Sequence, residues 1–124
     1  MIVAAGHLVY DALAAADALE ATGCLVSVFD PCFLKPMDAE GIWEAAKHAA
    51  LTVVAEENVA SGGLGCAVTR LLTEKRYSGN IRLLCVPDSF VPHGRQQELR
   101  RRLGLDAEGM ARLIREEIRV LEGG

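Results

Sequence analysis

The sequence predicts an α/β fold, a three-layer α/β/α sandwich around a mainly parallel open sheet of four to five strands. Four short apolar runs are rich in β-branched residues and continuous rather than alternating, which is typical of strands buried on both faces. Helical patterns separate these runs, as in βαβ units with right-handed crossovers. The 124 residues, 51% apolar and 24% charged, suffice for one core but not for two. We expect a single domain covering residues 1–124.

Strands and helices are expected to alternate along the chain. The strands are predicted at Ile2–Ala5, Leu25–Phe29, Leu51–Ala55 and Ile81–Val86. Apolar stripes predict helices from Leu8 to Leu19 and from Leu64 to Leu72. Between them, Asp38 is a suitable N-cap for a second helix over Asp38–Ala50.

The C-terminal part of the chain leaves the alternating pattern. The segment PDSFVPHG predicts a loop, which is followed by a short basic helix ending at Gly104. Asp106 is then expected to cap a final helix, in which Met110, Ile114 and Leu121 keep helical spacing. This last helix should therefore pack back on the sheet.

Charge and composition argue against several classes of partner. The net charge is −4 and the pI is near 5.3, so the chain repels phosphate backbones and acidic membrane surfaces. We expect no nucleic-acid and no membrane partner, and we interpret the basic run Arg100–Arg102 as a solvated helix face. The four cysteines form no C-x-x-C pair, and the N-terminus does not resemble a signal peptide. These features predict a reduced, soluble, cytoplasmic chain.

The run Leu51–Gly65, LTVVAEENVASGGLG, joins a buried strand to two carboxylates and a glycine-rich turn that opens a helix. Backbone N–H groups of such a turn can hold an anion, but the spacing fits neither the dinucleotide nor the P-loop pattern. Glu56 and Glu57 would also repel an anion, so we interpret the turn as structural. Neighbouring residues of a strand point to opposite faces, so the two glutamates are not expected to share a substrate. One of them should turn inward and be hydrogen-bonded.

The sequence contains no recognisable metal-binding motif or catalytic triad. A metal would need three convergent ligands, and no H-x-E, H-x-x-x-H or paired-cysteine spacing is present. Cys66 lies in the first turn of a predicted helix, where a thiolate is favoured, yet an inert packed cysteine is the more frequent case. We therefore predict no catalytic, cofactor-binding or metal residue in this chain.

Ligands of open parallel sheets bind at the carboxyl ends of strands where the strand order reverses. If the first and third strands are neighbours, this crevice begins at Gly6 and includes the glycine-rich turn. The candidate crevice or inter-domain residues are His7, Glu57, Asn58, Gly62, Gly63, Gly65 and His93.

Sequence blocks along essentially the whole chain resemble one family. They are Gly6, the run Phe33–Asp38, the block Glu56–Asn58 with Gly62, Gly63 and Gly65, the residues Pro87, Asp88, Phe90, His93 and Gly94, and lastly Gly104–Asp106. The glutamate and glycine turn is shared by transketolases and by the beta subunits of 2-oxo acid dehydrogenases. The PD-x-F-x-x-HG block followed by GLD is similar to the C-terminal domain of the 1-deoxy-D-xylulose-5-phosphate synthases, within the transketolase superfamily.

The resemblance implies a transferase that condenses pyruvate with glyceraldehyde 3-phosphate to start isoprenoid, thiamine and pyridoxal synthesis. In that family, thiamine diphosphate (thiamine pyrophosphate) and magnesium bind to preceding domains, whose GDG motif is absent here. The resemblance thus implies a supporting domain that packs on the preceding domains and contributes to a homodimer. It also implies a further, antiparallel strand just before Met1, without which a sheet edge would be open to self-association.

The sequence is compatible with three interpretations of this chain. The chain is expected to be catalytically silent alone, as the C-terminal domain of the synthase. Alternatively, it is the C-terminal part of a split transketolase, which the VPDSFVPHG segment disfavours. A free-standing module that binds a small metabolite in the crevice rests on analogy of fold alone.

Overall fold

A computed structural model shows four parallel strands in one sheet and describes residues 1–31, 37–59, 63–86 and 96–123. The strands are β1 (Ile2–Ala4), β2 (Val28–Phe29), β3 (Leu51–Val59) and β4 (Asn80–Val86), in the order β2-β1-β3-β4. Val3 pairs with Phe29 on one side and with Val54 on the other. The predicted parallel sheet, with the first and third strands as neighbours, is confirmed.

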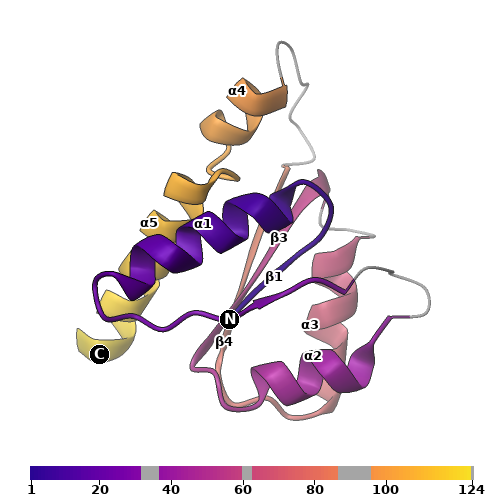
Figure 1. Cartoon of the computed structure of the whole chain (residues 1–124). Coiled ribbons are helices and arrows are strands. Elements are labelled where there is room, and N and C mark those ends of the chain that lie inside the picture. The colour runs from indigo at the N-terminus through magenta and orange to yellow at the C-terminus, as the bar shows by residue number, and fades with distance from the viewer. Residues whose placement is uncertain (32–36, 60–62, 87–95, 124) are drawn as a thin grey trace.

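Helices cover both faces of this sheet (Figure 1). Helices α1 (Leu8–Glu20) and α5 (Ala107–Gly123) lie on one face, and α2 (Ala39–Ala46) and α3 (Leu64–Glu74) lie on the other. The short helix α4 (Gln96–Arg102) lies beyond the carboxyl ends of the strands. The expected three-layer sandwich is therefore observed.

The core has two halves because successive strand residues point to opposite faces. Ile2 and Val53 pack under α1 and α5, whereas Val3 and Val54 pack under α2 and α3, and all four side chains are fully buried. Such burial on both faces explains why the strands read as continuous apolar runs.

Polar contacts fix the ends of several elements. The Asp38 carboxylate accepts a hydrogen bond from the Gly41 N–H at 2.9 Å, and Asp106 accepts one from the Gly109 N–H at 2.9 Å. Both predicted N-caps are confirmed. At the beginning of β3, the Tyr77 hydroxyl donates to the Ala49 carbonyl at 2.9 Å and accepts from the Thr52 hydroxyl at 3.0 Å.

Three boundaries differ from the sequence prediction by more than two residues. Strand β2 has two residues rather than five, because its partner β1 is itself only three residues long, and Leu25 is left 84% exposed. Strand β3 continues past Ala55 to Val59, where it still pairs with Val86 of β4. Helix α2 ends at Ala46, because the Ala49 N–H turns back to the Ala46 carbonyl at 2.8 Å. Within the residues that the structure describes, no helix is long and apolar enough to cross a membrane.

Candidate functional site

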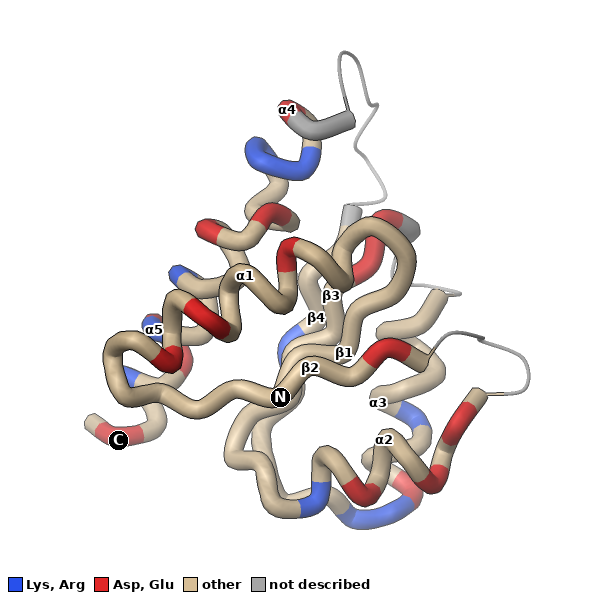
Figure 2. The backbone as a smooth tube through the Cα atoms, in the orientation of Figure 1, with Lys and Arg blue, Asp and Glu red and all other residues tan. Residues whose placement is uncertain are grey.

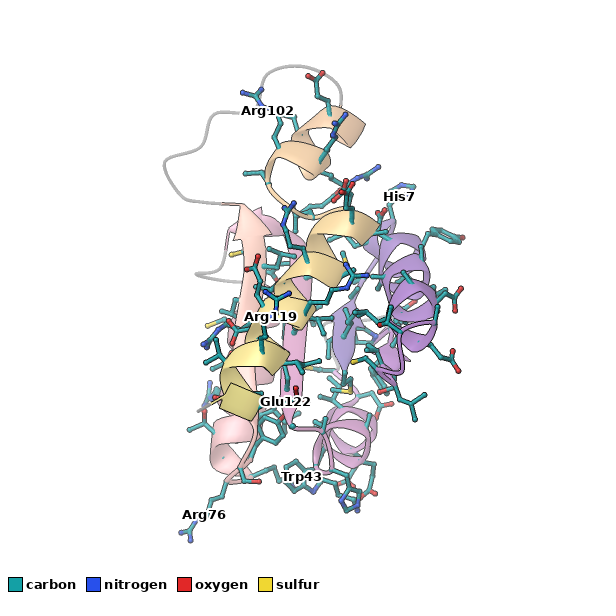
Figure 3. The ribbon with its side chains drawn as sticks, turned by 90° about the vertical axis from the view of Figure 1, so that its left-hand side faces the viewer. His7, Trp43, Arg76, Arg102, Arg119 and Glu122 are labelled. Atoms are coloured by element: carbon teal, nitrogen blue, oxygen red, sulfur yellow. The ribbon has the colours of Figure 1, made fainter. Side chains whose placement is uncertain are left out.

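The carboxyl ends of β1 and β3 lie side by side, as the crevice hypothesis requires. Gly6 follows β1 with a φ of +63°, a left-handed conformation that favours glycine. His7 comes next as the N-cap of α1, but its side chain makes no capping hydrogen bond and is exposed. Figure 3 shows His7 at the end of α1, pointing away from the sheet. The structure therefore places His7 at an outer rim rather than in an enclosed site.

Glu56 is the buried carboxylate of this region. It leaves β3 on the side of α3 with only 5% of its surface exposed, and its Oε2 accepts a hydrogen bond from the Gly65 N–H at 2.7 Å. The prediction that one glutamate turns inward and is hydrogen-bonded is confirmed. Burial raises the pKa of the Glu56 carboxyl, and the N–H groups of Gly65 and Leu64 oppose that increase.

The glycines of the turn make room for this carboxylate. A side chain at Gly63 would lie 2.8 Å from the Glu56 carboxyl carbon, and Gly65 packs on Leu83 of β4. Glu56 Oε1 is buried against Gly63 without a hydrogen-bond partner. A side chain of the chain itself thus occupies the beginning of α3, where an external anion would otherwise bind, which supports the structural interpretation of the turn.

Glu57 points to the opposite face of the sheet and pairs with α4. Its Oε1 lies 3.0 Å from Arg100 Nη1, and the two side chains are only 32% and 20% exposed. The interpretation of Arg100 as part of a solvated face is wrong, whereas Arg101 and Arg102 are exposed as expected. This half-buried ion pair connects the end of β3 to a helix that begins 39 residues after Glu57 (96 − 57).

The structure describes the remaining candidate residues only in part. Asn58 continues the backbone of β3, but its side chain, together with Gly62 and His93, lies outside the described residues. Cys66 is exposed on the first turn of α3, so the expectation that it is packed is wrong. Sequence reasoning missed Arg100 as a partner of Glu57, and no local signal could have revealed it, because the two residues are far apart in the chain.

The two adjacent glutamates make separate contacts and do not form a shared acid/base pair in the described region. Glu56 and Glu57 face opposite sides of the sheet and cannot act on one substrate. No group of three His, Cys, Asp or Glu residues in the described ranges is placed to hold a metal ion. The arrangement is instead that of a structural joint, in which one glutamate holds α3 and the other holds α4.

The described residues combine a parallel sheet with a glutamate and glycine joint at the end of β3. Residues 1–110 match the family described as "Transketolase, C-terminal domain", and the chain belongs to that family.

Individual relatives of this chain are 1-deoxy-D-xylulose-5-phosphate synthases. The chain is 43% identical over 118 residues to a 1-deoxy-D-xylulose-5-phosphate synthase of Magnetococcus marinus, covering 93% of this chain and 19% of the relative. It is 36% identical over 124 residues to the synthase of Aquifex aeolicus, covering 100% of this chain and 19% of the relative. The chain thus spans about a fifth of the length of the curated relatives that it matches.

A solved structure supports the fold. The chain is similar to a protein described as "Split gene transketolase, inactive beta4 tetramer", with a TM-score of 0.83 and 36% identity. The similarity covers 93% of this chain and 37% of the solved one.

Proposed function

We propose that this chain serves as the C-terminal, structural and dimer-supporting domain of a 1-deoxy-D-xylulose-5-phosphate synthase. The observation that carries the proposal is the 43% identity to such a synthase over 93% of this chain. In the complete enzyme, pyruvate and glyceraldehyde 3-phosphate are condensed for isoprenoid, thiamine and pyridoxal precursor synthesis. We assign thiamine diphosphate and magnesium to the preceding domains, and we place the assembly in the cytoplasm as a homodimer.

The geometry of the joint supports a role without chemistry. Glu56 and Glu57 are both used in internal contacts, one with the backbone of α3 and one with Arg100. A domain whose polar groups hold its own helices in place can present a stable surface to its neighbours. It is not expected to turn over substrate alone.

A fusion tests this function. We would replace the segment of the Magnetococcus marinus synthase that matches this chain by the chain itself, and measure condensation of pyruvate with glyceraldehyde 3-phosphate. The controls are this chain alone and the synthase without the segment. We expect activity in the fusion, and none in the isolated chain. Turnover by the pure chain, or an inactive fusion that is folded and binds thiamine diphosphate, would contradict the proposal.

A split transketolase is the second candidate, and the solved neighbour favours it. That neighbour has 36% identity and is described as a split gene transketolase. The alternative predicts that the chain restores transfer of a two-carbon unit between sugar phosphates when fused into a transketolase, and leaves the synthase fusion inactive. Measuring both reactions with both fusions separates the two candidates.

A further inference from the structure

Helix α1 carries two apolar stripes, and the sheet and α5 together bury only one of them. The buried stripe consists of Leu8, Ala12, Ala15, Ala16 and Leu19. On the opposite side, Tyr10, Leu13, Ala14, Asp17 and Ala18 follow the same helical spacing and are all exposed. We call these five residues the outer face of α1. A helix that is apolar around most of its circumference is typical of one that is covered on both sides.

Two large side chains of this face are exposed to solvent. Tyr10 is 74% exposed and Leu13 is 48% exposed, although they are only three residues apart and therefore adjacent on the helix surface. The alanines beside them leave room for another surface to approach closely. Burying such large apolar side chains is favourable, so the face is suited to a protein contact.

The charge of the outer face limits which surface can cover it. Asp17 lies within the face, and Asp11 and Glu20 complete the charged residues of α1, which are all acidic. The sequence has no Lys or Arg before Lys35. Figure 2 shows the contrast between the acidic α1 and the arginines of α4. A complementary surface must therefore carry apolar groups together with Lys or Arg.

A second copy of this chain does not meet that requirement through the same face. In a two-fold symmetric dimer the same patch meets itself, so the contact would contain the carboxylates of both copies and no cation from either face. The rest of the enzyme can supply such a surface, because this chain spans only 19% of the length of the synthase that it matches.

We propose that the outer face of α1 is the surface on which this domain docks to a basic and apolar surface elsewhere in the synthase polypeptide. This inference rests on the proposed function and deepens it by assigning the contact to Tyr10, Leu13 and Asp17. It places the contact on α1, on the side away from the sheet.

Hydroxyl-radical footprinting of the fusion with the Magnetococcus marinus synthase tests the docking surface, because the method measures the exposure of single side chains. Helix α5 supplies matched controls, since Val120 is 67% exposed and Leu121 is 39% exposed. We expect the oxidation rate of Tyr10 and Leu13 to fall severalfold from the isolated chain to the fusion, while the rate at Val120 and Leu121 stays the same. Unchanged oxidation of Tyr10 and Leu13 in an active fusion would overturn the inference and leave the proposed function intact.

Two other outcomes are distinguishable from these. Protection of Tyr10 in a folded but inactive fusion would support the docking surface and contradict the synthase function. Protection in the isolated chain that increases with protein concentration would show that a second copy covers the face, and would overturn the inference.

A charge reversal tests the electrostatic part. Asp17→Lys should lower the thermal midpoint of the fusion but not that of the isolated chain, because only the fusion contains the complementary cations. Glu122→Lys, on the exposed end of α5, is the matched control and should have no such selective effect. Equal effects of Asp17→Lys on both proteins would contradict the proposed charge complementarity.

Discussion

Gly63→Ala provides the sharpest test of the joint between β3 and α3. The φ of Gly63 is −103° and its ψ is −160°, an extended conformation that alanine adopts freely. The backbone therefore does not require glycine, and the added methyl group acts only through its neighbours. The nearest of these is the buried Glu56 carboxylate, whose carboxyl carbon would lie 2.8 Å from the new Cβ.

The expected cost follows from how the clash is relieved. Inserting a methyl group into a packed site costs about 1–3 kcal/mol. If the carboxylate moves away instead, it loses its hydrogen bond to the Gly65 N–H, and a hydrogen bond of a charged group contributes about 1.5–3 kcal/mol. The clash is relieved either by local strain or by loss of the hydrogen bond, so only one of these two costs applies. We therefore expect the free energy of unfolding to fall by about 2 kcal/mol rather than by the sum of both costs.

Urea denaturation, followed by circular dichroism and by Trp43 fluorescence, measures this loss. Gly123→Ala is the control, because beyond its chain neighbours and its own helix backbone no heavy atom lies within 4 Å of the added methyl group, and it should not destabilise the chain. A double-mutant cycle with Glu56→Ala should give a coupling energy of at least about 1 kcal/mol, since the clash requires both groups. Costs that add within about 0.5 kcal/mol would refute the proposed packing.

Three further predictions concern the same polar contacts. Burial raises the pKa of the Glu56 carboxyl, so folding favours its protonated form and the free energy of unfolding falls as the pH rises above the ordinary value of 4.5. Denaturation at several pH values should show that Glu56→Gln gains stability relative to the unmodified chain as pH increases, and a constant difference would contradict this sign. For Glu57 and Arg100, a double-mutant cycle of Glu57→Gln and Arg100→Gln should give a coupling free energy of about 0.2–1 kcal/mol, as expected of a half-buried ion pair. This coupling should decrease with added salt, and a coupling that is independent of salt would argue against an ionic contact. Tyr77→Phe should cost about 1 kcal/mol in urea denaturation because it removes a hydroxyl with two hydrogen bonds, whereas Tyr10→Phe on the exposed side of α1 should be neutral; equal effects would contradict the role of that hydroxyl.

The order of the elements and the parallel sheet were predictable from the sequence, because these features depend on patterns within short stretches of chain. A continuous apolar run such as Leu51–Ala55 predicts a buried strand wherever the sheet lies. Asp38 and Asp106 predict helix starts because a capping bond joins residues only three apart. The predicted position of a crevice rested on one topological assumption, that the first and third strands are neighbours, and the structure confirms that assumption.

The contacts of the candidate site could be predicted only in part. Alternation along a strand shows that Glu56 and Glu57 face opposite sides, but it does not say which side is closed by a helix. The answer depends on where α3 and α4 pack, and the tertiary structure buries Glu56 and pairs Glu57 with Arg100. Arg100 looks like any solvated arginine in the sequence, since its partner lies 43 residues away.

The sequence by itself determined the fold, the helix caps and the family resemblance, because each is encoded in local periodicity or in motifs of a few residues. Only the tertiary structure decided which glutamate is buried, how short β2 is, and how exposed Tyr10 and Leu13 of α1 remain. The physical reason is that burial and pairing are properties of surfaces brought together from distant parts of the chain, and the free energy of those contacts is absent from any single segment.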